Sequence, residues 1–260
     1  MTTKMYALIV LGGIVLFAVW FIFLAGGVDY PNTDVKDVDR DRLFLKTEEL
    51  LRQSDAWPQE LSDQSVTVTS SLAPYPVRTV RYTVEVNADL EKVIDYVRAE
   101  NYSGKTRREK ADKYEDTLWE QDDAQGRPVE WVRRSVHIAP KPGGNRDAVV
   151  IYFEDRPDPK TYRIAAQSVD TLDGKAWPVV ENAVRFRVLP SMYKVEEMAP
   201  GRVRIRKVEA VDPRGSMSTL MNNYFLSLYF FRNYMFGQAK DMRATLDAGG
   251  VHPAARTVAP

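Results

Sequence analysis

The sequence contains no cysteine and only two histidines, His137 and His252. Without cysteine the chain has no disulfide, no catalytic thiol and no thiolate metal ligand, and two histidines are too few for the usual zinc sites. The sequence also lacks an excess of either charge, because 36 lysines and arginines balance 36 aspartates and glutamates. A nucleic-acid binder would need a basic excess or a basic stripe. We therefore expect no cofactor, no metal and no nucleic-acid partner.

What the sequence does contain is a long apolar stretch at its N-terminus. Residues 5–28 carry no charged side chain. A helix of this length, rising about 1.5 Å per residue, crosses a bilayer core of about 30 Å, and the sequence therefore predicts a transmembrane anchor. A cleaved signal peptide is the alternative, although its apolar region is usually shorter, about 7–15 residues. Since only four residues precede the stretch, we expect the large domain to be extracytoplasmic, or periplasmic in a bacterium.

The rest of the chain shows helical and strand periodicities in turn. Residues 29–40 are predicted to be a polar linker, and residues 247–260 a flexible tail. Apolar residues at helical spacing predict a helix over residues 41–53 and another after Asp89. Alternation with period two predicts strands at residues 66–69, 80–86, 117–121, 130–138, 147–154, 161–169, 183–189, 192–198 and 203–211. The charge run at 107–113 is predicted to be a solvated loop.

A long aromatic helix is predicted after the last strand, over residues 218–246. One apolar stripe of about 100° contains Leu220, Tyr224, Leu228, Phe231, Met235, Ala239, Met242 and Leu246. The opposite side contains Phe225, Leu226, Tyr229, Phe230 and Phe236. A helix that is apolar all round must touch something on both sides. We expect the first stripe to cover a ligand cavity, and the second to contact a membrane, a partner protein or residues 41–57.

Several short motifs occur in an order that is typical of a known family. Asn87-Ala88-Asp89 joins a strand to an apolar helix, Arg146-Asp147 opens a strand, residues 162–170 read Tyr-Arg-Ile-Ala-Ala-Gln-Ser-Val-Asp, and Asp212-Pro213-Arg214-Gly215 precedes the last helix. In this order, residues 41–246 resemble the START lipid-transfer domain of the helix-grip superfamily. The resemblance implies an α+β fold, with a curved antiparallel sheet wrapped around a long C-terminal helix. It also implies one lipid-like molecule in an internal cavity, gated by that helix and the loop 138–145.

The family's last helix is often broken by a proline, and this one has none, so the type of ligand does not follow from the resemblance. Apolar cavity walls are expected from the strand faces at 149–153 and 162–166. The mixed face of the strand 130–138 either points to solvent or supplies Arg133 and His137 as polar anchors, and a buried arginine would then need a carboxylate or a ligand. The predicted ligand-binding residues are Arg133, His137, Ile151, Tyr162, Ile164, Tyr224, Leu228, Phe231 and Met235.

Catalysis has little support in the sequence. Ser135 and His137 lie two apart on a strand, side by side, and no acid is placed to orient the ring. Arg146-Asp147 is interpreted as a salt bridge or turn lock. We favour a non-enzymatic, membrane-anchored lipid-binding or lipid-transfer protein, with lipid and membrane as partners. The alternatives are a membrane-tethered module that binds a membrane protein, and a cyclase-like or hydratase-like enzyme using Arg133, His137 and Tyr162.

Overall fold

The computed structural model describes residues 29–63, 65–102, 108–110, 113–137, 145–214 and 234–250. The helical elements in these ranges are η1 Val35–Asp37, α2 Arg40–Gln53, η2 Ser54–Ala56, α3 Leu90–Asn101 and α6 Phe236–Asp247. The strands are β1 Gln59–Ser62, β2 Val66–Ser71, β3 Thr79–Val86, β4 Arg108–Lys110, β5 Lys113–Asp122, β6 Pro128–His137, β7 Asn145–Asp158, β8 Thr161–Ser168, β9 Thr171–Leu172, β10 Lys175–Ala176, β11 Ala183–Arg185, β12 Arg187–Val188, β13 Ser191–Ala199 and β14 Arg202–Asp212.

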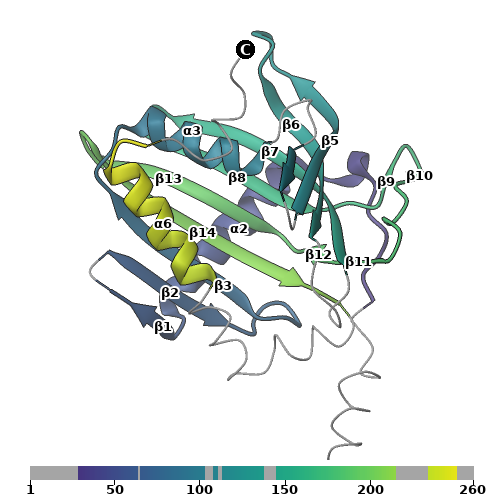
Figure 1. Cartoon of the computed structure of the whole chain (residues 1–260), viewed down its shortest axis with the longest axis horizontal. Helices are drawn as coiled ribbons and strands as arrows, with labels where there is room; N and C mark the ends of the chain where they lie inside the picture. Colours follow the sequence, from purple (N-terminus) through teal and green to yellow (C-terminus); the bar gives the residue numbers. More distant parts are fainter. Residues whose placement is uncertain are drawn as a thin grey trace, which may run out of the picture.

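One curved sheet dominates the fold (Figure 1). Its strands follow the order β1-β2-β3-β14-β13-β8-β7-β6-β5-β4, and β11 and β12 are attached to β7 and β14. All neighbours along that path are antiparallel, whereas β11 runs parallel to β7. The predicted α+β class and the large antiparallel sheet are confirmed. The charge run, predicted as a loop, contributes the edge strand β4.

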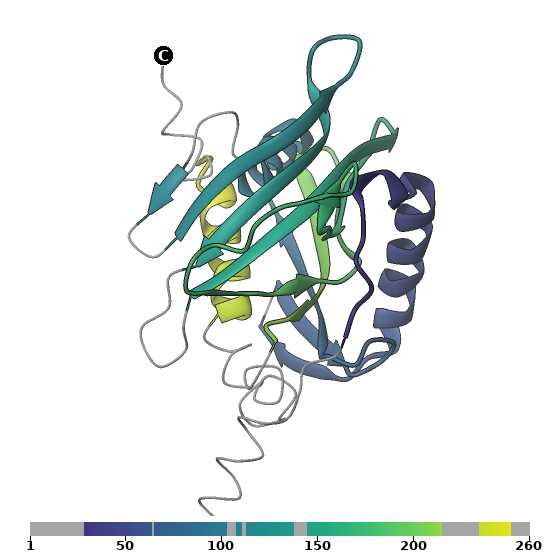
Figure 2. The same cartoon turned by 90° about the vertical axis from the view of Figure 1, so that its right-hand side faces the viewer.

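Helix α2 covers one face of the sheet, which we call the outer face (Figure 2). Asp39 caps the helix by accepting a hydrogen bond of 2.9 Å from the backbone N–H of Arg42. The predicted apolar residues of α2 are buried in the outer cluster, and the helix packs against β8, β13 and β14. Fully burying a leucine or phenylalanine side chain contributes about 1.5–3 kcal/mol, so this contact fixes which side of each strand faces outward.

The opposite, inner face is covered by α3 and α6 (Figure 1). Val93 and Val97 of α3, together with Ala239, Met242 and Leu246 of α6, are buried in the same apolar cluster as the inner side chains of the strands. Asp247 also accepts a hydrogen bond of 2.7 Å from the backbone N–H of Asn87, which ties the end of α6 to the segment before α3. Of the predicted helix 218–246, the structure describes the part from Tyr234 onward.

Among the described residues, no helix is long and apolar enough to cross a membrane. The predicted anchor at residues 5–28 lies outside the described ranges, as do residues 251–260 of the predicted tail. Residues 248–250 cap the C-terminal end of α6, because the N–H groups of Ala248, Gly249 and Gly250 donate to carbonyls of its last turn.

The segment that we predicted to be a linker is bound to the domain. Residues 29–38, which we call the N-terminal strap, run along the outer side of the sheet (Figure 2). The backbone N–H of Thr33 donates to Asp170 at 2.9 Å, Asp34 accepts from the Thr171 hydroxyl at 2.6 Å, and Val35 is buried in the outer cluster. The prediction of a flexible linker is therefore wrong for these residues, because their partners lie far along the chain.

The docked strap gives Asp34 a pH-dependent contribution to stability. Hydrogen bonds from Thr171 and then from Gly174 lower the pKa of Asp34 from 3.8 to about 2. A carboxyl whose folded pKa is depressed stabilises the fold above its unfolded pKa and loses that contribution as the pH falls toward the folded value. We expect Asp34→Asn to be less stable than the wild type at pH 6, with a difference that shrinks between about pH 4 and about pH 2. Urea denaturation of the wild type and of Asp34→Asn across this pH range measures the difference in their free energies of unfolding.

Thr171→Val is the matched control, since it removes the strongest of these hydrogen bonds. In that background the Asp34→Asn substitution should have a smaller effect and a weaker pH dependence. A difference between wild type and Asp34→Asn that is the same at pH 6 and pH 2.5 would contradict the assignment.

Candidate functional site

The inner face of the sheet carries a group of polar and charged side chains in the middle of its apolar cluster. They come from β3, α3, β5, β6, β7, β13 and β14 and therefore converge only in the folded protein. We call this group the inner polar cluster; it comprises Tyr82, Glu100, Glu115, Arg133, Ser135, Tyr152, Tyr193, Lys207 and Glu209.

Arg133 is the centre of one half of this cluster. Its guanidinium donates to the Tyr152 hydroxyl at 2.7 Å and to the Glu100 carbonyl at 2.8 Å, and it forms an ion pair with Glu115 at 3.3 Å. Its Cζ atom also lies 5.0 Å from the centroid of the Tyr152 ring. The side chain of Arg133 is only 9% exposed. The buried charge is thus compensated by a carboxylate, a carbonyl and an aromatic face.

The other half is built from three adjacent strands, β3, β14 and β13, and from helix α3. The Tyr193 hydroxyl donates to Glu100 Oε1 at 2.6 Å, and the Tyr82 hydroxyl donates to Tyr193 Oη at 3.1 Å. Lys207 forms an ion pair of 2.8 Å with Glu209, and its Nζ atom lies 4.8 Å from the centroid of the Tyr193 ring. The cluster is therefore continuous from β3 to α3 through shared hydroxyl and carboxylate oxygens.

The electrostatics of the cluster fix its protonation states near neutral pH. Burial, followed by the nearby Glu100 carboxylate, raises the pKa of Tyr193 well above its usual value. Burial alone would lower the pKa of Lys207, but Glu209 and the surrounding groups outweigh it and raise that pKa. For Arg133, burial likewise lowers the pKa, but Tyr152 and Glu115 outweigh burial, so the pKa is raised. The site thus offers two permanent cations and neutral phenols.

The structure brings several of the predicted ligand-binding residues to the inner face. Arg133, Tyr162, Ile164 and Met235 all lie there, and the last three are part of its apolar cluster. The buried guanidinium of Arg133 was expected to need a carboxylate or a ligand, and Glu115 supplies the carboxylate. His137 lies at the end of β6, with its ring centroid 5.8 Å from that of Phe186.

Two predicted placements are wrong. Ile151 was expected to line the inner cavity, but it is buried in the outer cluster, and its neighbours Val150 and Tyr152 point inward instead. Phe236 was expected to face outward, but it is partly buried and packs against the inner cluster. The remaining predicted positions lie outside the described residues: Tyr224, Phe225, Leu226, Leu228, Tyr229, Phe230 and Phe231.

Most of the inner polar cluster was not predicted from the sequence. Glu100, Tyr193 and Lys207 were each assigned to a helix or strand without a role. A signal was present for Lys207 and Glu209, because they stand two apart on a strand whose preceding residues of the same parity, Val203 and Ile205, are apolar. Charged residues that follow apolar residues on the same face of a strand indicate a buried polar site.

Arg146 and Asp147 act as a structural lock, as expected. Asp147 is completely buried and accepts two hydrogen bonds from the Arg185 guanidinium, at 2.8 and 2.9 Å, and one from the backbone N–H of Val180 at 3.2 Å. Arg146 donates from Nε to the carbonyl of Pro213 at 3.2 Å. These contacts hold β11 parallel to β7 and fasten the end of β14 to the start of β7.

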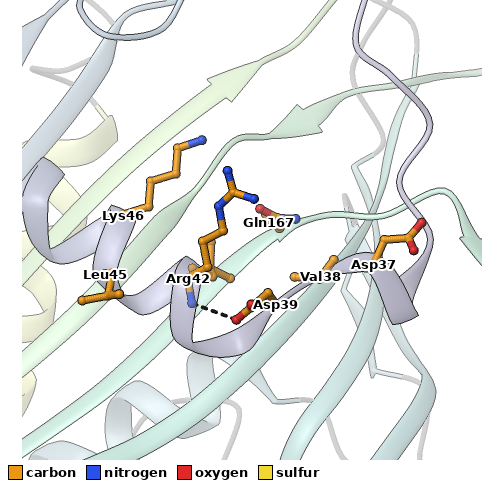
Figure 3. A pocket seen from close by; sticks show the side chains of 8 residues that line it. Asp37, Val38, Asp39, Arg42, Leu45, Lys46 and Gln167 are labelled. Atoms are coloured by element: carbon orange, nitrogen blue, oxygen red, sulfur yellow. Dashed lines mark hydrogen bonds between the residues drawn. The ribbon is translucent and has the colours of Figure 1, made fainter.

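The outer face carries two grooves beside α2. The larger, of about 600 Å³, lies between the start of α2 and Gln167 of β8, and Figure 3 shows Arg42 and Lys46 extending over it. The smaller, of about 440 Å³, lies on the other side of the exposed Leu45. Both grooves are separated from the inner polar cluster by the sheet itself, so they are not the predicted ligand site.

A curved antiparallel sheet with helices on its inner face defines the START-like, helix-grip class of folds. No family model matches the sequence, and no curated protein matches it. Among solved structures, the chain is similar to human StAR-related lipid transfer protein 5, with a TM-score of 0.60 and 17% identity over 78% of this chain and 94% of that one. It is also similar to human STARD10, with a TM-score of 0.56 and 18% identity over 83% of this chain and 81% of that one.

A bacterial structure shows the same fold. It is a fragment of the STAR-related lipid transfer protein from Xanthomonas axonopodis, with a TM-score of 0.52 and 20% identity over 74% of this chain and 99% of that one. At these identities the likeness establishes the START-like fold, which is the fold that the motif order predicted.

Proposed function

We propose that the protein is a membrane-anchored, non-enzymatic lipid-binding or lipid-transfer protein. One hydrophobic ligand would lie between the inner face of the sheet and the C-terminal helix. The observation that carries this proposal is the inner polar cluster, a group of fixed charges and hydroxyls enclosed by apolar side chains. Two of the three similar solved structures are lipid transfer proteins by name, the human StAR-related protein 5 and the Xanthomonas axonopodis fragment.

The composition of the inner face fits an amphiphilic ligand. Ligand cavities are mostly apolar, with a few polar groups that fix orientation. Tyr162, Ile164 and Met235 supply apolar walls, and Arg133 and Lys207 supply charge. Each cation is already paired with a carboxylate, and Glu100 adds a third. A head group that donates hydrogen bonds, such as a hydroxyl or an amine, therefore suits the cluster better than a phosphate.

Membrane attachment is the second part of the proposal. The support is the uncharged stretch at residues 5–28, long enough to cross a bilayer, and it would place the domain on the extracytoplasmic side. Residues 138–145 and the helix predicted at 218–246 would admit the ligand. The aromatic residues predicted on the second side of that helix would contact the membrane or a membrane protein.

Native mass spectrometry of the purified full-length protein, followed by lipid extraction, tests ligand binding. We expect about one lipid per protein molecule, with a hydroxyl-bearing or amine-bearing head group. The control is a sample stripped of lipid and then incubated with vesicles of mixed composition, which should regain the same lipid class. A protein that carries no lipid and takes none from vesicles would contradict the proposal and favour a module that binds another membrane protein.

A further inference from the structure

One end of the sheet gathers three points of the chain that are far apart in the sequence. The described chain begins there at Asp29, β14 ends there at Asp212, and β7 begins there at Asn145 (Figures 1 and 2). Arg146 ties two of these points together through its hydrogen bond of 3.2 Å to the carbonyl of Pro213. The third point, the N-terminus of the strap, is joined to them by Tyr30.

Tyr30 is enclosed by charged groups from the strand ends. The guanidinium carbons of Arg187 and Arg214 lie 5.9 and 5.5 Å from the centroid of its ring. The ring also packs against the small apolar cluster of Val77, Leu189 and Ala210. Two cations on one aromatic ring, both attracted by the charge distribution of the ring, hold the ring at the end of β14.

The next residues of the strap continue this attachment. The carbonyl of Pro31 accepts from Arg187 at 3.2 Å, and Arg187 forms an ion pair of 2.8 Å with Asp170. Asp170 also accepts from the backbone N–H of Thr33 at 2.9 Å, and its own N–H donates to the Thr33 carbonyl at 2.8 Å. Arg187 is only 5% exposed, so this arrangement is a buried one.

The strap leaves almost no free chain between the apolar stretch and the domain. Residues 5–28 are uncharged and Tyr30 is already held. Two residues of extended chain span at most about 7 Å. A flexible linker of about a dozen residues, as the sequence had suggested, would reach about 20 Å on average. A domain attached so closely cannot turn freely relative to a bilayer that holds residues 5–28.

We infer that the N-terminal strap fixes the orientation of the domain, so that the sheet end formed by Tyr30, Asp212–Arg214 and Arg146 faces the lipid surface. This inference rests on the proposed membrane anchor. Arg214 and Asn145 both lie at this end, and in the sequence they adjoin the predicted C-terminal helix and the predicted loop. A bound lipid would therefore be exchanged with the membrane that carries the anchor.

The absence of cysteine allows the orientation to be measured directly. Leu72→Cys places a label just after β2, at the end of the sheet near Tyr30, where Leu72 is 51% exposed. Gln125→Cys places a label in the exposed β5–β6 turn at the opposite end. Strands of about 10 residues separate the two ends by about 30 Å. The full-length, singly labelled proteins are reconstituted in phosphatidylcholine vesicles that carry a head-group energy acceptor.

We expect energy transfer to the lipid surface to be at least twofold greater from position 72 than from position 125. Inserting about a dozen Gly and Ser residues between Asp29 and Tyr30 leaves the strap contacts in place and should abolish the difference, because the inserted chain reaches about 20 Å. The same insertion after Gly250 is the control and should preserve it.

The possible results distinguish a failure of the fixed orientation from a failure of the membrane anchor. Equal transfer from both positions in a protein that floats with the vesicles would overturn the fixed orientation and leave the anchor intact. Protein that does not float with the vesicles would overturn the anchor, and the inference with it. Lipid bound to the soluble part in either case would leave the ligand-binding proposal standing.

Discussion

Replacing Asp147 by alanine is expected to remove about 3–5 kcal/mol of folding stability, the usual cost of breaking a buried ion pair from one side. The side chain of Arg185 is 13% exposed, and the substitution removes both carboxylate oxygens of Asp147 that accept hydrogen bonds from its guanidinium. It also removes the acceptor of the Val180 N–H. Domains of this kind are stable by about 5–15 kcal/mol in total, so urea denaturation should show a large fall in the midpoint.

Two further variants test the cause of this effect. Asp173→Asn removes the charge of a carboxylate that pairs with Lys36 but is 60% exposed, and exposed pairs of this kind contribute about 0–1 kcal/mol. Asp147→Leu combined with Arg185→Met removes both buried charges and should recover much of the loss, since apolar residues often replace a buried pair without cost. If Asp147→Ala is no more destabilising than Asp173→Asn, the buried pair of Asp147 and Arg185 does not stabilise the fold.

The second large effect is expected at Arg133, in lipid binding. Arg133→Met alone would leave Glu115 buried without its cation, which destabilises the fold and obscures binding. We therefore combine Arg133→Met with Glu115→Leu, so that neither charge remains unpaired. Because the pair would orient the polar head of the ligand, the double variant should retain at least tenfold less of the co-purifying lipid in native mass spectrometry.

Arg134→Met is the matched control for this experiment. Arg134 is adjacent on β6, but successive side chains of a strand point to opposite faces, so it does not reach the inner polar cluster. Its lipid occupancy should equal that of the wild type. A double variant that folds and carries the normal amount of lipid would show that the inner polar cluster does not contact the ligand.

The helices and most strands could be predicted from the sequence because their periodicity is strong. Leu43, Phe44, Leu50 and Leu51 mark α2 by helical spacing, and all four are buried as expected. The strand faces were harder. Val149 to Phe153 are five consecutive buried apolar residues, and a strand buried on both sides has no alternation to show which side faces the ligand. This is why Ile151 was placed on the wrong face.

The strap and most of the polar cluster could not be found from local pattern. Thr33 and Asp34 form their hydrogen bonds with Asp170 and Thr171, both 137 positions away. The stretch is polar and contains a proline, so its composition is that of a linker. Its partners are too far along the chain for a local pattern to reveal them. Tyr193 and Glu100 meet only because α3 folds over β13. Arg133 was a candidate because it shares a mixed strand face with Trp131, Ser135 and His137, which is a local signal, although that face was equally compatible with solvent.

The sheet order has a consequence for biosynthesis. β3, near the start of the domain, pairs along its length with β14, the last strand of the described chain, from Val203 opposite Val86 to Ala210 opposite Thr79. Until residues 202–212 leave the ribosome, β3 and β13 each present an unpaired strand edge, and such edges pair readily with other chains. A nascent chain truncated before Arg202 therefore consists of two half-sheets without backbone hydrogen bonds between them, and β14 completes the sheet.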